Sequence, residues 1–162
     1  MIVISAMSQD RVIGKGDGLP WHVPEEYKQF LDFIRGQTVI LGRRSYPIFG
    51  KGLTSDHNVV VSRSVNELPG AVVAHTIEEA IEVATSYGKT VFSAGGSTIY
   101  EQTIPLADAM YLSFMKGSFT GDAFFPPFEE SEWRVEARTD HPAFEFVTYK
   151  RKRLIKLLAN SY

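Results

Sequence analysis

The regular alternation of short apolar runs with segments of helical period constrains the fold of this chain more than any other feature. The apolar runs are rich in β-branched residues and lie at 2–7, 38–41, 58–62, 71–74 and 90–93. Such runs suit strands that are buried on both faces of a sheet. Segments of helical period separate them, at 24–35, directly after Gly42, at 76–87 and at 97–103. The alternation predicts an α/β fold in which helices cover the faces of a mainly parallel sheet.

The pattern changes after Asp108, where the helical segments stop. Runs at 109–115, 133–138 and 144–150 have the composition of strands and are joined by turns. These last runs predict an antiparallel strand at the C-terminal edge. The Pro-rich stretch 122–127 is interpreted as a loop. Together the patterns predict three layers, with a mixed, mostly parallel sheet of about eight strands flanked by about four helices.

The length of the chain indicates one domain over residues 1–162. A chain of this size buries roughly 70% of its unfolded surface and has no need of a second core. Residues 150–162 form a basic C-terminal extension in which Lys and Arg alternate with Leu and Ile. A docked helix or a solvated tail is the favoured interpretation, and contact with an acidic surface is the alternative.

Composition narrows the classes of function. The chain has no cysteine and a formal net charge of -2. Disulfides and thiolate metal sites are therefore ruled out, and no global field would attract nucleic acid or an anionic membrane. The four histidines lack the close spacing of a zinc site. We expect a cytoplasmic monomer that binds small molecules, without a metal, a nucleic acid or a membrane as partner.

One glutamate in the predicted helix at 24–35 is a candidate functional acid. Pro24 suits a first helical turn, and two acidic residues follow it at the positive end of the helix dipole. Glu26 shares a helix face with Phe30 and Phe33, whereas the polar side carries Glu25, Lys28, Gln29 and Asp32. A carboxylate among aromatic rings should have a raised pKa, as proton chemistry or ligand binding requires. The alternative is that Glu26 serves only the helix dipole.

Two strands run through glycine directly into a helix, at Gly42 and at Gly95–Gly96. Glycine lets a phosphate approach the backbone, where N–H groups of the first helical turn are free to bind an anion. Gly95–Gly96 suits a pyrophosphate, and its alternative interpretation is a tight turn.

Three arginines follow predicted strands near these turns, namely Arg43, Arg44 and Arg63. Guanidinium groups can clamp a phosphate monoester, which favours NADPH over NADH as the cofactor. Arginines after strands are also often simply solvated.

A set of motifs in fixed order extends over nearly the whole chain. They are DRVIG at 10–14, GLPW at 18–21, PEE at 24–26 with Phe30, LGR at 41–43, VSR at 61–63, AGG at 94–96 with Tyr100, YLS at 111–113 and GDAFFP at 121–126. This ordered set resembles the dihydrofolate reductase family, bacterial type. The resemblance implies an NADPH-dependent oxidoreductase that forms tetrahydrofolate for one-carbon metabolism, by hydride transfer to pterin C6 with protonation at N5.

The resemblance also implies the roles of the substrate residues. Glu26 takes the role of the active-site acid, where bacterial members usually have Asp. Trp21 helps to hold a water, and Leu19 belongs to the mobile loop. The other implied substrate contacts are Ile4, Ser5, Phe30, Phe49, Lys51 and Ser113.

For the cofactor, the resemblance implies nicotinamide, pyrophosphate and 2'-phosphate contacts. The nicotinamide set is Ala6, Ile13, Gly14, Gly18 and Leu19. The set around the phosphates is Gly42, Arg43, Arg44, Ser45, Ser62, Arg63, His75, Ala94, Gly95, Gly96, Ser97, Thr98, Ile99 and Tyr100. Closure of the loop at 14–21 would exclude solvent, and Gly121 with Asp122 would brace that loop.

One departure from the family pattern leaves an alternative open. Asp56 stands where members usually carry an arginine that binds the glutamate tail of folate. Lys51 and His57 are candidate replacements for that cation. The alternative activity is therefore reduction of a tail-less pterin or a pyrimidine. An alternative of a different class is a non-catalytic nucleotide-binding module.

Overall fold

The computed structural model describes residues 1–152, and its elements follow the predicted alternation. The strands are β1 (Ile2–Met7), β2 (Val12–Gly14), β3 (Thr38–Gly42), β4 (His57–Val61), β5 (Val72–Ala74), β6 (Val91–Ser93), β7 (Ala109–Met115), β8 (Ala123–Phe124), β9 (Trp133–Asp140) and β10 (Phe144–Arg151). The α-helices are α1 (Pro24–Ile34), α2 (Ser45–Phe49), α3 (Ile77–Ser86) and α4 (Ser97–Thr103), and short 3-10 turns lie at Ile104–Leu106 and Glu130–Glu132.

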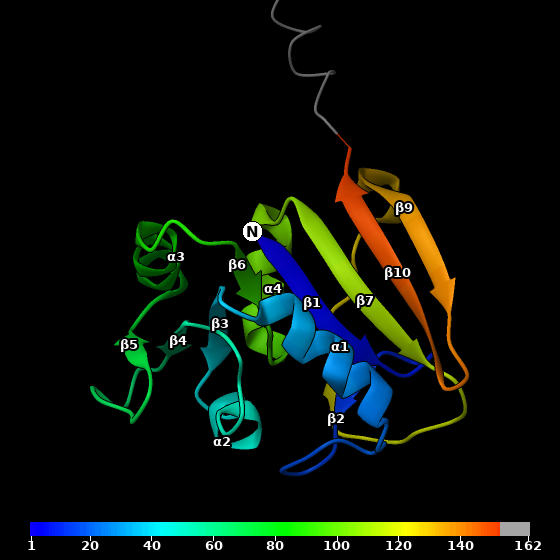
Figure 1. Ribbon diagram of the computed structural model, residues 1–162, viewed down its shortest axis with the longest axis horizontal. Coiled ribbons are helices and arrows are strands. Elements are labelled where there is room, and N and C mark those ends of the chain that lie inside the picture. Colours follow the sequence, from blue (N-terminus) through cyan, green and yellow to red (C-terminus); the bar gives the residue numbers. More distant parts are fainter. Residues whose placement is uncertain (153–162) are drawn as a thin grey trace, which may run out of the picture.

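Eight strands form one sheet in the order β5-β4-β3-β6-β1-β7-β10-β9. The pairs from β5 to β7 are parallel, and β10 runs antiparallel to both β7 and β9. In Figure 1 the β9–β10 hairpin forms the orange and red edge of the sheet. The predicted mixed sheet with an antiparallel C-terminal strand is confirmed.

The central strands bury both of their faces, which explains their continuous apolar runs. Val39 and Leu41 of β3 pack into the cluster that includes Ile34 of α1. Ile40, between them, packs into the opposite cluster with residues of α3 and α4. The three layers are therefore α1, the sheet, and the pair α3 and α4, and Figure 1 shows α1 in front of the sheet with α4 behind it.

A second, two-stranded sheet differs from expectation. β2 pairs antiparallel with β8, which lies inside the stretch 122–127 interpreted as a loop. β8 has only two residues, and two prolines follow Phe125 directly after it, so its sequence carries no strand signal. Its conformation comes from pairing with β2, a contact between distant parts of the chain.

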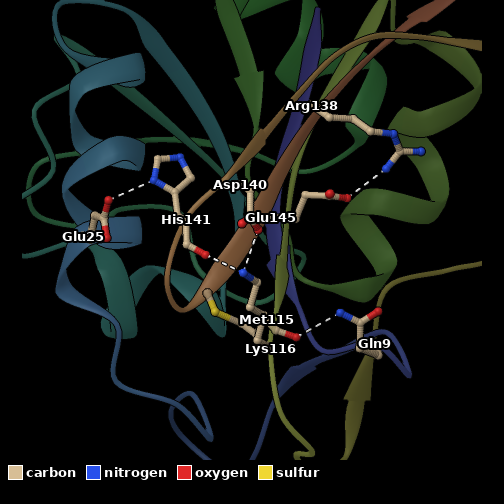
Figure 2. Close-up of polar contacts among 8 residues, drawn as sticks. All are labelled: Gln9, Glu25, Met115, Lys116, Arg138, Asp140, His141 and Glu145. Carbon is tan, nitrogen blue, oxygen red and sulfur yellow. Dashed lines mark hydrogen bonds and ion pairs between the residues drawn. The ribbon is translucent and has the colours of Figure 1, made fainter.

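Polar contacts connect the start of α1 to the turn of the β9–β10 hairpin (Figure 2). His141 Nδ1 lies 2.9 Å from Glu25 Oε1, and Lys116 Nζ donates to Asp140 Oδ1 at 2.6 Å and to the His141 carbonyl at 2.7 Å. The contact between His141 and Glu25 places the first turn of α1, which carries Glu26, beside the hairpin turn.

Loss of the N-cap of α3 should lower stability measurably. The Thr76 hydroxyl accepts a hydrogen bond from the Glu79 N–H at 3.1 Å. We expect Thr76→Ala to lower the free energy of unfolding by about 1 kcal/mol, and Tm by roughly 3 °C, because that N–H loses its partner. Thermal unfolding of Thr85→Ala, at an exposed site on the same helix, is the control. An equal loss in both variants would contradict the cap's contribution.

No helix in residues 1–152 is long and apolar enough to cross a membrane. Most of the basic extension predicted at 150–162 lies outside the described residues.

Candidate active site

A cleft of about 590 Å³ opens beyond the carboxyl ends of β1 and β6. This is where open α/β sheets usually bind ligands. Residues from β1, the loop before α1, α1, α2 and the turn after β6 line it. Those that the sequence predicted are Ile4, Ser5, Ala6, Ile13, Leu19, Trp21, Glu26, Phe30, Ser45, Phe49, Ala94, Gly95, Gly96 and Tyr100.

Glu26 lies at the inner wall of this cleft, with 9% of its surface exposed. Within residues 1–152 it forms no ion pair. Burial raises the pKa of its carboxyl from the usual 4.5 to about 7, and a hydrogen bond with the Ser113 hydroxyl partly opposes this rise. Desolvation dominates because a charge loses more by leaving water than one hydrogen bond returns. Glu26 can therefore exchange a proton near neutral pH.

The raised pKa predicts a cost to stability at neutral and alkaline pH. Unfolded Glu26 ionises near 4.5 and the folded residue near 7, so between these values the folded state binds more protons and stability falls as pH rises. Glu26→Gln removes that charge. We expect this variant to exceed the native protein in free energy of unfolding by about 3 kcal/mol at pH 8, and by almost nothing below pH 4.5. Urea unfolding at both pH values measures the difference.

The same experiment on Glu25→Gln controls for the change of a glutamate on this helical turn, because Glu25 is exposed. Its difference from the native protein should stay within about 1 kcal/mol at both pH values. A Glu26→Gln variant with a pH-independent stability difference would contradict the burial argument.

Trp21 is another buried side chain of the cleft with a polar atom. Its ring packs edge-on against Phe119, with centroids 5.5 Å apart. Among the described residues its indole Nε1 has no hydrogen-bond partner. A buried N–H that lines a cleft and lacks a protein partner is suited to a water or a polar ligand atom.

Phe30 and Phe49 both line the cleft and pack edge-on against one another, with ring centroids 6.3 Å apart. The sequence reasoning missed several other lining residues, namely His22, Val23, Pro24, Tyr27, Lys28, Leu31 and Ile48. Tyr27 and Leu31 are four positions apart on α1, and in the sequence they directly follow Glu26 and Phe30. Helical neighbours of the predicted residues were thus a usable signal.

The structure supplies the tertiary partners of two residues on the predicted faces of α1, Phe33 on the apolar face and Gln29 on the polar side. Phe33 does not line the cleft and packs on Tyr111, with ring centroids 5.0 Å apart. Seven residues carry it about 10 Å along the helix axis, past the cleft. Gln29, on the polar side, is half-buried, and its Nε2 donates to Ser113 Oγ at 3.3 Å. The neighbouring strand β7 covers this part of the helix.

The glycine turn after β6 meets β3 and the start of α4. Gly42 N–H donates to the Gly95 carbonyl at 2.7 Å, and α4 begins at Ser97. Gly95 has φ +95°, and a Cβ there would lie 2.8 Å from the ring of Tyr100. Tyr100 itself is buried and donates its hydroxyl to the Ile4 carbonyl at 2.8 Å. Gly96 is a glycine, so no side chain of its own covers its backbone. A Cβ added at this position would have Ser45 Oγ as its nearest neighbour, at 3.5 Å.

The three predicted arginines lie outside the cleft lining but along one edge of the sheet. Arg43 and Arg63 each follow a strand end, and those ends are adjacent because Gly42 pairs with Val61. Within residues 1–152 none of the three arginines forms an ion pair, and Arg44 and Arg63 are exposed. His75 Nδ1 lies 2.8 Å from the Ser62 carbonyl, which places both beside this edge.

Other predicted site residues stand apart from the cleft. Lys51 and Thr98 are exposed, and Ile99 packs in the core behind Gly42. Ser113 is buried behind Glu26. His57 stacks on Tyr87 with ring centroids 3.7 Å apart.

The loop at 14–21 closes one side of the cleft and is held by residues far along the chain. Lys15 and Gly18 form an isolated bridge within it, and the Gly16 N–H donates to the Asp122 carboxylate at 3.2 Å. Gly121 packs so closely that a Cβ there would lie 2.3 Å from the Gly14 carbonyl oxygen. The expected contact of Gly121 and Asp122 with this loop is confirmed.

The sheet and the cleft define a class of protein, namely α/β proteins that bind a ligand beyond the carboxyl ends of parallel strands, with a buried acid on one wall and a glycine turn on another. The family model described as "Dihydrofolate reductase" matches residues 1–153. The chain belongs to the dihydrofolate reductase family.

Individual relatives agree with the family match. Dihydrofolate reductase HdrB of Haloferax volcanii is 33% identical over an alignment that covers 94% of this chain and 84% of that protein. Dihydrofolate reductase type 3 of Salmonella typhimurium is 32% identical over 93% of this chain and 98% of its own. A solved dihydrofolate reductase from Enterococcus faecalis, in complex with NADP(H) and RAB-propyl, superposes with a TM-score of 0.84 at 30% identity, over 94% of this chain and 96% of its own.

Proposed function

We propose that this protein reduces 7,8-dihydrofolate to 5,6,7,8-tetrahydrofolate with NADPH, and so serves one-carbon metabolism. The observation that carries the proposal is the Glu26 carboxyl, buried in the cleft that ends at Gly95 and Gly96, with its pKa raised to about 7. The family match and the names of the relatives support the same activity. Their names give no support to the alternative of a tail-less pterin or a pyrimidine.

The residues present fit NADPH. Gly96 and Ser97 would hold the pyrophosphate with backbone N–H groups, since no Cβ covers Gly96. Arg43, Arg44 and Arg63 would bind the 2'-phosphate. The remaining proposed contacts to the cofactor are Ala6, Ile13, Gly14, Gly18, Leu19, Gly42, Ser45, Ser62, His75, Ala94, Gly95, Thr98, Ile99 and Tyr100. Bound NADPH supplies the hydride that the pterin C6 receives.

The pterin would occupy the inner part of the cleft, between Ile4, Ser5 and Glu26. The Glu26 carboxylate would accept hydrogen bonds from the ring nitrogen and the 2-amino group. Phe30 and Phe49 would enclose the aminobenzoyl part. Ser113 supports Glu26 from behind, and a protein that only bound a nucleotide would have no need of this buried acid.

Protonation of N5 would use a water held near Glu26 and the Trp21 indole, whose Nε1 lacks a partner among the described residues. The raised pKa lets Glu26 hold a proton for that water near neutral pH. Closure of the 14–21 loop, in which Leu19 is 38% exposed, would exclude bulk solvent from this exchange.

The cation for the glutamate tail of the substrate has several candidates. Asp56 is exposed, with Lys89 Nζ 4.0 Å from its carboxylate. His57 stacks on Tyr87, and Lys51 lies outside the cleft lining, although both were candidates from the sequence. Lys28 is a further candidate for this cation because it lines the cleft. Its Nζ also donates to the Asp32 carboxylate at 2.7 Å.

The proposal includes a single domain, a monomeric state and a cytoplasmic location. Continuity of the eight-stranded sheet supports one domain over 1–162. Large exposed apolar side chains such as Leu106, Val72 and Phe124 lie on separate elements, which supports a monomer. The absence of cysteine supports the cytoplasm.

The test is the loss of NADPH absorbance at 340 nm when purified protein is mixed with dihydrofolate. Turnover that depends on both compounds, with tetrahydrofolate as the product, is expected. NADPH binding without turnover would contradict the proposal.

A further inference from the structure

Gln29 connects α1, which carries Glu26, to β7, which carries Ser113. It stands on α1 three residues after Glu26, and its Nε2 donates to Ser113 Oγ across 3.3 Å. The two partners are 84 residues apart in the sequence. Ser113 has 2% of its surface exposed and lies on β7, where it pairs with Ala6 and Phe146.

The direction of these hydrogen bonds has a consequence for Glu26. An amide NH₂ group can only donate, so the Ser113 oxygen must accept from Gln29. The hydroxyl proton is then available for another acceptor, and the Ser113 hydroxyl is the group that lowers the pKa of Glu26 against the effect of burial. A hydroxyl that receives a hydrogen bond also donates more strongly.

We propose that Gln29 is a positioning residue for Glu26, because its amide orients the Ser113 hydroxyl so that this hydroxyl donates to the Glu26 carboxylate. The inference rests on the proposed function of Glu26. Gln29 itself does not line the substrate cleft. It lines a separate groove between α1 and His141, together with Glu25 and Asp32. It therefore acts only through Ser113.

Other titratable groups surround Glu26 and remain in place when Gln29 is changed. On α1 they are Glu25, Lys28 and Asp32, and His22 precedes the helix. Tyr100 on α4 has its pKa raised, first by burial and also by the charge of Glu26. His141 contacts Glu25 from the hairpin turn. A readout specific to Glu26 separates its titration from all of these.

The experiment follows the side-chain carboxyl carbon of Glu26 by NMR in ¹³C-glutamate-labelled protein, assigned by its absence in Glu26→Gln. Gln29→Met has a similar length and no donor. We expect it to raise the pH at half-titration of Glu26 by roughly 0.5 to 1 unit, because Ser113 is no longer oriented. The pH profile of kcat/KM should move by the same amount. Gln29→Leu provides a second variant, and its shift should be equal.

A double-mutant cycle with Ser113→Ala tests whether Gln29 acts through the hydroxyl. In the Ser113→Ala background the change of Gln29 to Met should move the Glu26 titration by less than about 0.2 unit, an amount near the limit of a pKa comparison. Gln102→Met is the control, since exposed Gln102 donates only to the Thr98 carbonyl of its own helix.

The inference is overturned if Gln29→Met leaves the Glu26 titration unmoved, or if it moves it equally with and without the Ser113 hydroxyl. The NMR titration needs no turnover. An inactive native protein would therefore contradict the proposed function, whereas an active protein with an unmoved titration would contradict only the role of Gln29.

Discussion

Glu26→Gln is expected to lower kcat at pH 7 by a hundredfold or more, on the order of the contribution of a positioned acid or base. Glutamine keeps the length of the side chain and one acceptor oxygen. It cannot place a negative charge beside the pterin or exchange a proton with a nearby water. The loss should therefore fall on turnover. NADPH affinity should change by less than about twofold, because Glu26 is not among the proposed cofactor contacts.

Steady-state rates and fluorescence titration with NADPH measure the two quantities. Glu25→Gln is the matched control, since Glu25 adjoins Glu26 but is exposed and contacts His141. It should keep at least half of native turnover. Unchanged turnover in Glu26→Gln would remove the assigned role of this acid, and an equal loss in both variants would point to a general effect of charge on the helix.

The second large effect is expected at Gly95, where alanine should both destabilise the fold and weaken NADPH binding. The residue has φ +95°, which side chains rarely adopt, and the new Cβ would lie 2.8 Å from the Tyr100 ring. Tyr100 cannot move aside freely, because it is 4% exposed, packs on Phe125 and donates to the Ile4 carbonyl. We expect a loss of roughly 3 to 5 kcal/mol in the free energy of unfolding, and a fall in Tm of roughly 10 °C.

NADPH affinity should fall at least about tenfold, since the turn proposed for the pyrophosphate must shift by tenths of an ångström. Gly88→Ala isolates the cost of the backbone conformation, because Gly88 has φ +69° and nothing within 4 Å of the new Cβ. It should lose only about 1 kcal/mol and bind NADPH normally. Calorimetry and NADPH titration of both variants decide the matter, and equal losses would show that the contact with Tyr100 is unimportant.

The predicted fold was largely correct because local signals and tertiary structure agree in the central sheet. Continuous β-branched runs become strands with two buried faces, and the helical period of residues 24–34 and 77–86 becomes α1 and α3. The prediction missed β2 and β8, because each exists through pairing with the other. Local sequence does not contain such a contact.

The candidate site likewise has features that local sequence indicates and features that only tertiary contacts decide. The spacing of Glu26 from Phe30 correctly indicated an inward acid, because both lie within one turn on one face of a helix. Helical spacing did not give the tertiary partners of Phe33 and Gln29, since it gives direction around an axis but not what lies beside each turn. Tertiary contacts place Phe33 on Tyr111 and Gln29 on Ser113.

The sequence by itself determined the class of fold, the glycine turn at Gly95–Gly96 and the identity of the acid, since each depends on residue type and short-range spacing. Only the tertiary structure decided how strongly Glu26 is desolvated and which distant groups support it. Those properties come from β7 and the loop at 14–21, which the chain brings to α1 from distant positions in the sequence. A raised pKa is therefore a property of the assembled cleft, because desolvation depends on everything that excludes water from one carboxyl.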